Sequence, residues 1–295
     1  MAHATSSNPS HTHQTAFVLA GGGSLGAVEV GMLQALLEAG ETPAFIVGVS
    51  AGAINAAYFA AEPTRAGAEK LELIWCALRR RDVLPLSLRS VLGMVLGRGH
   101  LVDSAALRRL LERHLPYRQL EQAALPVHIV ASDMLSGDEV LLSSGSVIDA
   151  VLASSAIPGV FPPVQIGSQL LVDGGVANNT PISTAIRLGA TRIIVLPTGF
   201  ACALNRLPSG AIARAMHALS LLVSRQLVHD AERFAGSAIT LRIVPSLCPL
   251  DVSPYDYSAA SSLITQAKAS TRQWLEGGGL DRDEVPGELR EHQHA

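Results

Sequence analysis

Two short apolar stretches near the start of the chain each run into a glycine-rich turn and then into a helix-forming segment. The first is "TAFVLAGGGSLG", residues 15–26, and the second is "AFIVGVSAG", residues 44–52. When a helix follows a buried strand at once, it carries the chain back along the sheet, so the next strand pairs in parallel. This pattern predicts an α/β protein whose strands end at a common edge.

Further apolar runs extend this alternation along the chain. Strands are predicted in "PVHIVASD", "EVLLSS", "QLLVDGG", "RIIVLP" and "AITLRIV", and helices in "GAVEVGMLQALLEAG", "AGAINAAYFAAE", "AGAEKLELIWCALRRR", "SVIDAVLASSA", "TPISTAIRLGA", "AIARAMHALSLLVSRQLVHDAERF" and "YSAASSLITQAKASTRQWLE". Strands that alternate with helices build a mostly parallel sheet with helices on both of its faces. We therefore expect a three-layer α/β/α fold with a mostly parallel central sheet.

The ends of the chain and one internal stretch fall outside this alternation. The predicted organisation is a disordered polar tail, a single α/β domain and a second polar tail, at residues 1–14, 15–279 and 280–295. Within the domain, a motif-bearing core over 15–200 precedes C-terminal helices over 205–279. Residues 83–103 are apolar but have no clear period, which is typical either of a lid over a site or of a packed irregular loop.

The composition narrows the class of protein and of partner. Hydrophobic residues make up 48% of the 295 residues and charged residues only 16%, which is enough apolar material for a thick core. The formal net charge is −3, so no overall basic field favours binding to nucleic acid. No apolar stretch is long and uninterrupted enough for a transmembrane span, and the N-terminus lacks the regions of a signal peptide. We interpret the chain as cytoplasmic, with peripheral rather than integral membrane contact.

Neither the cysteines nor the histidines suggest a metal or a cofactor. Cys76, Cys202 and Cys248 are odd in number and widely spaced, which fits neither a disulfide framework nor a zinc site. The ten histidines include no HExxH pair. We expect no bound metal and no cofactor. A short basic run, Arg79–Arg81, is typical of a solvated helix end, with contact to anionic head groups as the alternative.

The first candidate motif is the glycine-rich loop of Gly21, Gly22, Gly23, Ser24 and Gly26, between the first predicted strand and the first predicted helix. Successive glycines let backbone N–H groups turn toward one point, and the helix N-terminus adds its positive end. Such a loop can hold a phosphate, a dinucleotide pyrophosphate or a tetrahedral oxyanion. A dinucleotide site would need an acidic residue at the tip of the second strand, where this chain has a serine motif instead. A tight turn that only needs small residues is the structural alternative.

The second motif is Gly48-Val49-Ser50-Ala51-Gly52, where the second predicted strand meets the second predicted helix. G-x-S-x-G at a strand-to-helix turn is the pattern of a nucleophile elbow, in which the serine Oγ stands clear above a helix N-terminus. The N–H of Ala51 would then help to hold an oxyanion. Because a G-x-S-x-G also arises by chance in a chain of this length, a purely structural turn stays open at this point.

The third motif is Asp173-Gly174-Gly175, at the end of another predicted strand. Polar residues after it are expected to cap the helix that begins at Pro181: Asn178, Asn179 and Thr180. Asp-Gly by itself is a common turn signal. All three motifs, however, follow predicted strands of one α/β domain, and the carboxyl ends of parallel strands form a rim where ligands bind. A glycine cradle, a serine at an elbow and a carboxylate are the components of an acyl hydrolase.

Together these motifs resemble the patatin-like phospholipase family. The family pattern is a glycine-rich oxyanion loop, a G-x-S-x-G elbow and a D-G-[AG] motif, in that order, and the corresponding stretches here are "GGGSLG", "GVSAG" and "DGG". The stretches "ASSAIPGVFPPV" (153–164) and "LVDGGVANNTPI" (171–182) are similar to the family around its acidic residue. The resemblance extends over residues 15–200, and "SPYDYSAASSLITQA" is similar to the end of bacterial members.

The resemblance implies a serine lipid acyl hydrolase that cleaves carboxylic esters with a Ser-Asp dyad and no histidine. Ser50 is implied as the nucleophile and Asp173 as the base. The implied oxyanion donors are the backbone N–H groups of Gly21, Gly22, Gly23 and Ser24. The implied partner is a lipid or phospholipid substrate at a membrane or micelle surface, contacted through the apolar stretch 83–103.

One position departs from the family pattern and leaves alternatives open. The fifth residue of the loop is usually Arg or Lys, whereas here it is Leu25, so a cation is missing beside the backbone donors. This supports a non-catalytic binding or scaffold protein that keeps the fold. The other alternative is an α/β-hydrolase with a Ser-Asp-His triad, which would use His217 or His229, although both lie in a predicted helix.

Overall fold

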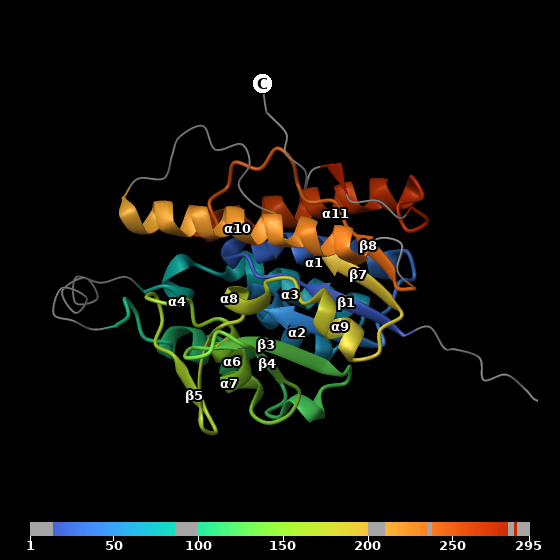
Figure 1. The fold of residues 1–295 in the computed structure, drawn as a ribbon. Helices are drawn as coiled ribbons and strands as arrows, with labels where there is room; N and C mark the ends of the chain where they lie inside the picture. The colour runs from blue at the N-terminus through green and yellow to red at the C-terminus, as the bar shows by residue number, and fades with distance from the viewer. Residues whose placement is uncertain (1–13, 86–98, 200–209, 235–237, 283–285, 288–295) are drawn as a thin grey trace, which may run out of the picture.

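A central sheet organises the part of the chain that the computed structural model describes, residues 14–85, 99–199, 210–234, 238–282 and 286–287. Its strands are β1 Thr15–Leu19, β2 Phe45–Val49, β3 Val127–Asp133, β4 Glu139–Leu142, β5 Val164–Ile166, β6 Gln169–Asp173, β7 Arg192–Leu196 and β8 Thr240–Ile243. They form one eight-stranded sheet in the order β5-β6-β3-β2-β1-β7-β8, with β4 paired to β3 beside this path. Helices lie on both sides of the sheet, which confirms the predicted three-layer α/β fold (Figure 1).

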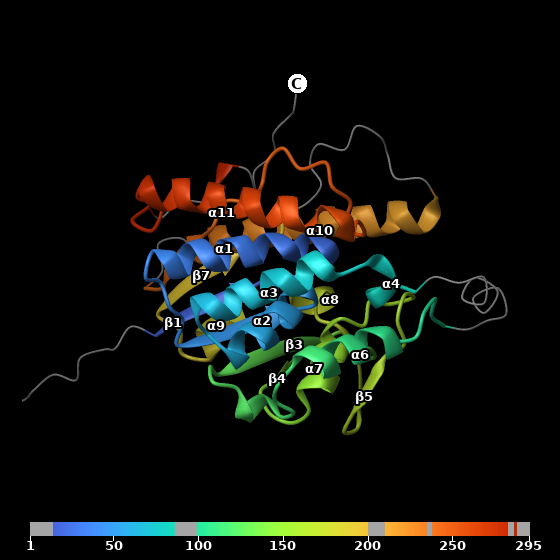
Figure 2. The ribbon, with the colours of Figure 1, turned by 180° about the vertical axis from the view of Figure 1, so that it is seen from behind.

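The helices divide between the two faces. They are α1 Ala27–Glu38, α2 Ala51–Ala61, α3 Arg65–Ala77, α4 Arg80–Val83, α6 Ala105–His114, α7 Val147–Ser154, α8 Gly175–Asn178, α9 Ile182–Arg187, α10 Ala211–Phe234 and α11 Ala260–Glu276, with 3-10 turns at Gly23–Gly26, Leu120–Gln122 and Tyr257–Ala259. Helices α1, α2, α3 and α11 share one hydrophobic core with the sheet, and α9 and α10 share another (Figures 1 and 2).

The apolar runs form strands because both faces of the sheet are covered. Along β1, Phe17 and Leu19 enter the core under α1 and α2, while Ala16 and Val18 enter the core under α9 and α10. A strand with helices on both sides therefore has no face left for polar residues, which explains the continuous apolar stretches in the sequence.

The centre of the sheet is parallel and one side of it is antiparallel. Strand β1 pairs in parallel with β2 and β7, β2 with β3, and β7 with β8. The pairs β3–β4, β3–β6 and β5–β6 are antiparallel. The "mostly parallel" sheet is thus confirmed, with an antiparallel margin that the sequence pattern did not reveal.

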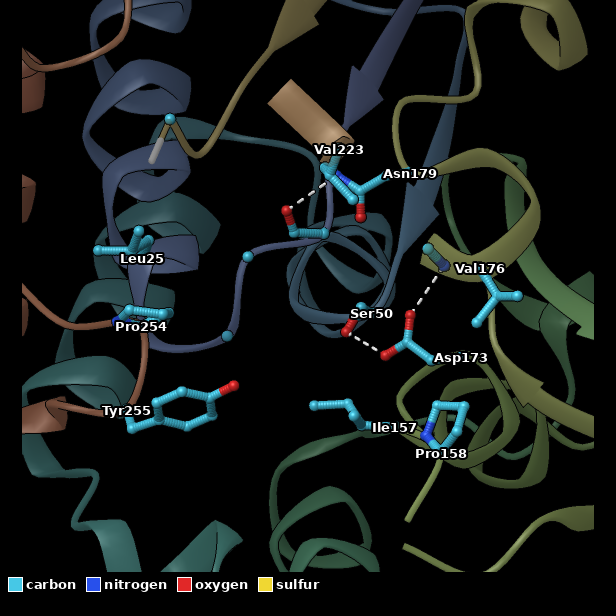
Figure 3. A pocket seen from close by; sticks show the side chains of 15 residues that line it. Leu25, Ser50, Ile157, Pro158, Asp173, Val176, Asn179, Val223, Pro254 and Tyr255 are labelled. Atoms are coloured by element: carbon cyan, nitrogen blue, oxygen red, sulfur yellow. Dashed lines mark hydrogen bonds between the residues drawn. The ribbon is translucent and has the colours of Figure 1, made fainter. Parts of the chain in front are cut away.

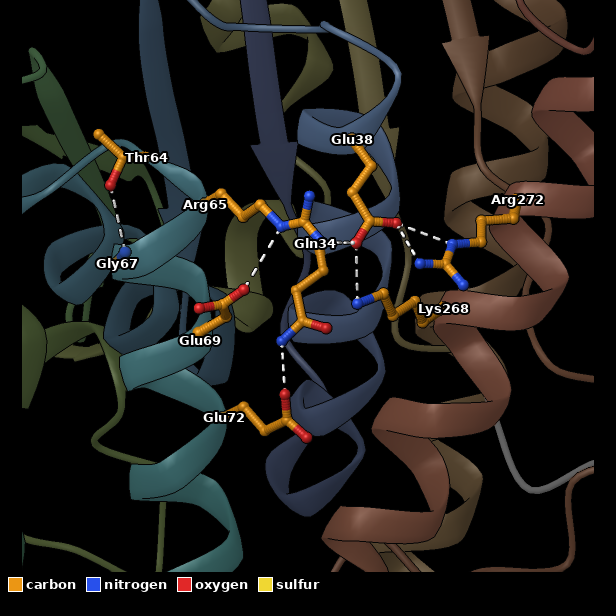
Figure 4. A network of polar contacts seen from close by, with 9 residues as sticks. All are labelled: Gln34, Glu38, Thr64, Arg65, Gly67, Glu69, Glu72, Lys268 and Arg272. Atoms are coloured by element: carbon orange, nitrogen blue, oxygen red, sulfur yellow. Dashed lines mark hydrogen bonds and ion pairs between the residues drawn. The ribbon is translucent and has the colours of Figure 1, made fainter.

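A cluster of charges ties the C-terminal helix to α1, the helix that follows the glycine loop. Glu38, at the end of α1, pairs with Arg65 at 2.9 Å and with Lys268 at 3.0 Å, and it accepts a hydrogen bond from Arg272 at 2.8 Å (Figure 4). Burial raises the pKa of Glu38, but the hydrogen bonds from Arg272 and Lys268 outweigh it and lower the pKa overall. Helices α1, α3 and α11 are therefore held together at one carboxylate.

Several sequence predictions fall wholly or partly outside the described residues. These are most of the two polar tails and, within the stretch 83–103 that was expected to be a lid or a packed loop, residues 86–98. Helix α6 lies after that stretch and was not predicted, although its buried positions Ala106, Leu107 and Leu111 lie on one helical face. Across the described ranges, none of the helices is both long enough and apolar enough to cross a bilayer.

Candidate active site

Ser50 lies at the turn between β2 and α2 in a strained backbone conformation. Its φ is 53° and its ψ is −117°, and among the described residues it is the one non-glycine residue with a positive φ. A non-glycine residue in this region costs on the order of 1–3 kcal/mol and persists only where its surroundings enforce it. The side chain is only 8% exposed and faces a cavity (Figure 3). The strand-to-helix turn expected from G-x-S-x-G is therefore present.

Two serines that sequence reasoning did not single out hold Ser50 in this conformation. Ser154 Oγ accepts a hydrogen bond from the Ser50 N–H at 2.9 Å and donates to the carbonyl of Val130 at 2.6 Å. Ser155 Oγ donates to the Ser50 carbonyl at 3.3 Å. Both serines belong to "ASSAIPG" at the C-terminal end of α7, so the stretch that resembles the family supports the turn at Ser50.

Gly52 allows α2 to begin close against the neighbouring strand. A Cβ at this position would lie 2.5 Å from the carbonyl oxygen of Leu19 in β1, closer than packed atoms come. The other motif glycines are similarly enclosed by their neighbours: Gly21, Gly22, Gly26, Gly48, Gly174 and Gly175. The glycines therefore let the three loops pack against one another around Ser50.

Asp173 lies within hydrogen-bond distance of Ser50. The Ser50 Oγ donates to Asp173 Oδ2 at 2.7 Å, and the N–H of Gly175 donates to Asp173 Oδ1 at 2.8 Å (Figure 3). Asp173 is 6% exposed, and burial raises the pKa of its carboxyl to about 6 despite these two hydrogen bonds, which lower it. The carboxylate is consequently ionised at neutral pH and is a stronger base than an exposed aspartate.

Asp173 reaches this position by a route that the sequence did not predict. We expected all three motifs at the carboxyl ends of parallel strands, but β6 runs antiparallel to β3, with Asp173 opposite Ala131. Only the last three residues of β6 pair with the last three of β3. Because the overlap is confined to this edge, the end of β6 still brings Asp173 to the rim where Ser50 lies.

The glycine loop presents fewer free N–H groups than the sequence suggested. The N–H of Gly21 donates to the carbonyl of Asn179 at 3.1 Å, and the N–H of Ser24 donates to the carbonyl of Pro254 at 2.8 Å. Gly21 and Ser24 are therefore not available as oxyanion donors, contrary to the prediction. Within the described residues, the N–H groups of Gly22 and Gly23 have no acceptor. Gly23 has a φ of 60°, which turns its N–H relative to that of Gly22.

Asn179 and Thr198 fix the start of this loop. The side-chain amide of Asn179 donates to the Gly21 carbonyl at 3.1 Å, and Thr198 Oγ1 donates to the same oxygen at 2.8 Å. The prediction that Asn178, Asn179 and Thr180 cap the next helix is wrong, because the cap residue of α9 is Pro181 and no side chain bonds there. Asn179 instead connects the loop after Asp173 to the loop after β1.

A segment between β8 and α11 completes the site from the other side. Besides the bond from its N–H to Pro254, Ser24 donates a hydrogen bond from its hydroxyl to the carbonyl of Ser253, with an Oγ–O distance of 3.1 Å. Tyr255, which follows Pro254, points its phenol into the cavity in front of Ser50 (Figure 3). Burial, and to a lesser extent the charge of Asp173, raises the pKa of Tyr255 to about 12, so this hydroxyl stays protonated. Sequence reasoning missed this role, because "SPYDY" has no catalytic pattern.

Two adjoining cavities open onto Ser50. The first, called the glycine-loop cavity, is bordered by the loop, by Asp173 and by a group of apolar side chains: Leu25, Ile157, Pro158, Val176, Val223 and Pro254 (Figure 3). The second, called the apolar cavity, extends under α2, α3 and α6, with Tyr58, Trp75, Leu107, Leu110 and Phe161 among its walls. Ser50 thus borders both cavities; Gly22 lines only the first, and aromatic and aliphatic side chains form most of the wall of the second.

The histidines of the triad alternative do not lie at these cavities. His217 and His229 both belong to α10. Neither they nor any other described histidine lines the glycine-loop cavity or the apolar cavity. The described surroundings of Ser50 therefore contain a carboxylate and no imidazole.

A buried polar network connects the two helices that begin at the glycine loop and at Ser50. Asn55 on α2 donates to the Gly26 carbonyl at 2.8 Å and to Glu29 Oε2 on α1 at 2.7 Å, and its Oδ1 accepts from Trp75 Nε1 on α3 at 2.7 Å. Glu29 is fully buried, and this burial raises the pKa of its carboxyl well above the usual value. The spacing of the loop relative to Ser50 therefore depends on one amide side chain.

Replacing Asn55 by alanine is expected to lower the free energy of unfolding by about 3 kcal/mol or more, because three buried polar groups lose their partner. Urea unfolding at neutral pH measures the loss. The comparison variant is Glu29→Gln, which keeps an oxygen that can accept from Asn55 and removes a buried ionisable group, so it should destabilise the fold less than Asn55→Ala. A loss below about 1 kcal/mol for Asn55→Ala would show that the network does not support the two helices.

The fold and this geometry define a three-layer α/β protein with a serine at a strand-to-helix turn beside a buried aspartate. A family model described as patatin-like phospholipase matches residues 17–186, more than half of the chain, and the chain belongs to this family. The segment around Tyr255 and helices α10 and α11 lie beyond the matched residues.

Relatives of known sequence and structure agree with this placement. An uncharacterized NTE family protein of Mycobacterium tuberculosis is 38% identical over 168 residues, which are 56% of this chain and 27% of that protein. The human patatin-like phospholipase domain-containing protein 6 is 31% identical over 190 residues, 62% of this chain and 13% of that protein. The chain thus spans only a fraction of these relatives' length. Human GIVD cytosolic phospholipase A2 has the same fold, with a TM-score of 0.51 at 12% identity, over 90% of this chain and 58% of the other.

Proposed function

We propose that the chain is a serine hydrolase of lipid carboxylic esters and that Ser50 and Asp173 form its catalytic dyad. The observation that carries this proposal is the 2.7 Å hydrogen bond from Ser50 Oγ to Asp173 Oδ2, between an apolar cavity and two unbonded backbone N–H groups. Family membership supports the choice of lipids as substrates. The intact Ser50 and Asp173 weigh against the scaffold alternative.

In the first half of the reaction, Ser50 Oγ attacks the ester carbonyl while Asp173 accepts the hydroxyl proton. The resulting oxyanion accepts hydrogen bonds from the N–H groups of Gly22 and Gly23, and the N–H of Ala51 at the start of α2 is the third candidate donor. A donor of this kind contributes roughly 3 kcal/mol to the transition state. Asp173 then returns the proton to the departing alkoxide, which leaves as an alcohol, and the acyl group remains on Ser50.

In the second half, water takes the place of the alcohol. Asp173, ionised again, removes a proton from the water as its oxygen attacks the acyl carbonyl, and the same N–H groups stabilise the second oxyanion. Collapse of that intermediate breaks the bond to Ser50 Oγ, which regains the proton from Asp173, and a carboxylic acid leaves. The apolar cavity is suited to the acyl chain throughout, because its described walls offer no charge to desolvate.

The activity is expected to rise with pH through an apparent pKa of about 6, because Asp173 must be ionised to accept the serine proton. Below that value the protonated carboxyl cannot act as a base, so kcat/KM should fall roughly tenfold per pH unit; above it the activity should be constant. The measurement is kcat/KM for an uncharged ester from about pH 4.5 to pH 8.5. A profile that stays flat across this range would argue against Asp173 as the base.

The proposal as a whole is tested by hydrolysis of a short-chain p-nitrophenyl ester and of a long-chain lipid ester in detergent micelles. Release of alcohol and fatty acid that depends on Ser50 supports the hydrolase. A folded wild-type chain that cleaves neither ester would favour the non-catalytic scaffold that Leu25 suggested.

A further inference from the structure

Apart from Asp173, the described walls of the two cavities at Ser50 carry no charge. The residues bordering the glycine-loop cavity include one further ionisable side chain, Tyr255, and its raised pKa keeps it neutral. The apolar cavity is bordered by tyrosines, a tryptophan, a phenylalanine, aliphatic residues and small residues. No lysine, arginine or histidine of the described residues lines either one. Among the described lining residues, the negative charge of Asp173 is therefore not balanced by any cation.

Leu25 occupies the place where a loop side chain could have supplied that cation. It is 3% exposed and borders the glycine-loop cavity next to Pro254 (Figure 3). Across the cavity lie Val176 and Ile157, so apolar groups line this cavity on both sides.

Five described arginines border hollows next to the apolar cavity rather than the two cavities at Ser50; Arg81, Arg109 and Arg113 line one such hollow. Arg79 and Arg80 border a surface hollow that shares Tyr255 and Tyr257 with the apolar cavity, so the two tyrosines form a wall between the arginines and Ser50. Tyr257 is itself stacked on Trp75, with ring centroids 6.4 Å apart, which fixes that wall. These guanidinium groups therefore lie outside the lining of both cavities at Ser50.

A phosphodiester would be unfavourable in this position. In a glycerophospholipid the phosphate is only a few bonds from the ester, so it would enter next to the Asp173 carboxylate. Two like unit charges about 8 Å apart, at an effective dielectric constant of about 20, repel strongly enough to slow a reaction roughly 30-fold. Loss of hydration adds to this penalty, because apolar walls cannot replace the water around a phosphate.

We propose that the substrates are esters with an uncharged alcohol part, such as acylglycerols or esters of long-chain alcohols, rather than glycerophospholipids. This inference rests on the proposed function, because it assumes that Ser50 and Asp173 cleave the ester. It adds the chemical class of the leaving alcohol, which we infer from the apolar lining and from the lack of a cation among the described lining residues.

The test compares lipids that share their acyl chains and differ in charge. Dioleoylglycerol, dioleoylphosphatidylcholine and dioleoylphosphatidylglycerol are presented at the same mole fraction in nonionic detergent micelles, and fatty acid release is measured for wild type and Ser50→Ala. We expect kcat/KM for the diacylglycerol to exceed that for phosphatidylglycerol by at least about tenfold, given the repulsion described above.

Charge-adding variants show whether the lining causes this selectivity. Leu25→Arg should lower the ratio of kcat/KM for diacylglycerol to kcat/KM for phosphatidylglycerol about tenfold. Leu25→Met should leave this ratio as in wild type. Since Leu25 is buried, Leu25→Arg could fail to fold, and a second pair of variants at an exposed position keeps the test valid in that case. Val176 is 51% exposed at the same cavity, so Val176→Arg can be compared with Val176→Gln.

The outcomes separate this inference from the proposed function. If Ser50-dependent cleavage of phosphatidylglycerol is as fast as that of diacylglycerol, or faster, the inferred selectivity is wrong. The proposed hydrolase function would still stand. If Val176→Arg and a folded Leu25→Arg both keep the wild-type ratio of the two kcat/KM values, charge in the lining is not the cause of the selectivity. Absence of Ser50-dependent release from every lipid and from the p-nitrophenyl ester would refute the proposed function itself.

Discussion

Replacing Ser50 by alanine should reduce kcat for ester hydrolysis by roughly 10⁴-fold or more, because removal of a nucleophile leaves only the contributions of binding and of the oxyanion donors. The fold should survive the change. Ser50 is buried and makes its main-chain bonds to Ser154 and Ser155 through groups that alanine also has. Fatty acid release and p-nitrophenol release measure the effect, and circular dichroism checks the fold.

The matched control for this variant is Ser155→Ala. Ser155 is also buried and borders the apolar cavity, but its Oγ is bonded to the Ser50 carbonyl rather than to a carboxylate. Its loss should reduce kcat by less than about tenfold, as expected for one weak supporting hydrogen bond. Activity of Ser50→Ala that stays within tenfold of wild type would exclude Ser50 as the nucleophile.

Replacing Asp173 by asparagine should have two opposite effects: a loss of about 10³-fold or more in kcat, and a gain in stability at alkaline pH. The activity falls because an amide cannot accept the proton of Ser50. The stability rises because the folded state holds Asp173 with a pKa of about 6, above the ordinary value of 3.8. Its contribution therefore favours folding at low pH and is lost as the pH rises through about 6.

Above that pH the ionised carboxylate destabilises the fold by on the order of 3 kcal/mol, from a shift of about two pKa units. Asparagine removes this cost and can still accept the hydrogen bond from the Gly175 N–H. Urea unfolding should show Asp173→Asn more stable than wild type at about pH 8, with the difference shrinking toward pH 4. A variant that is less stable at pH 8, or a difference independent of pH, would contradict the assignment of the raised pKa.

The fold and the identity of the central residues were predictable because their signals are local. Apolar runs of strand length followed by helical spacing specify the order of elements, and Gly48 and Gly52 around Ser50 mark the turn. A covered sheet then has few ways to arrange such units, so the three-layer architecture follows from the pattern. The proposed dyad partner was found through its Asp-Gly-Gly stretch.

The remaining details depend on contacts between segments far apart in the sequence. Whether the Gly21 N–H is free depends on Asn179, and whether the Ser24 N–H is free depends on Pro254, some 230 residues later. No local pattern reports such bonds, so the sequence suggested four loop donors where the structure leaves Gly22 and Gly23. The antiparallel direction of β6 was missed for the same reason, since strand pairing is non-local.

The most direct test of the account is covalent labelling with an alkyl fluorophosphonate, followed by peptide mass spectrometry. The account predicts one equivalent of label on Ser50, none in Ser50→Ala, and much slower labelling in Asp173→Asn. Labelling of wild type should also slow as the pH falls through about 6, because the same carboxylate activates the serine. Label on a different residue, or an active enzyme whose Ser50 stays unmodified by the reagent, would contradict the central claim that Ser50 is the nucleophile.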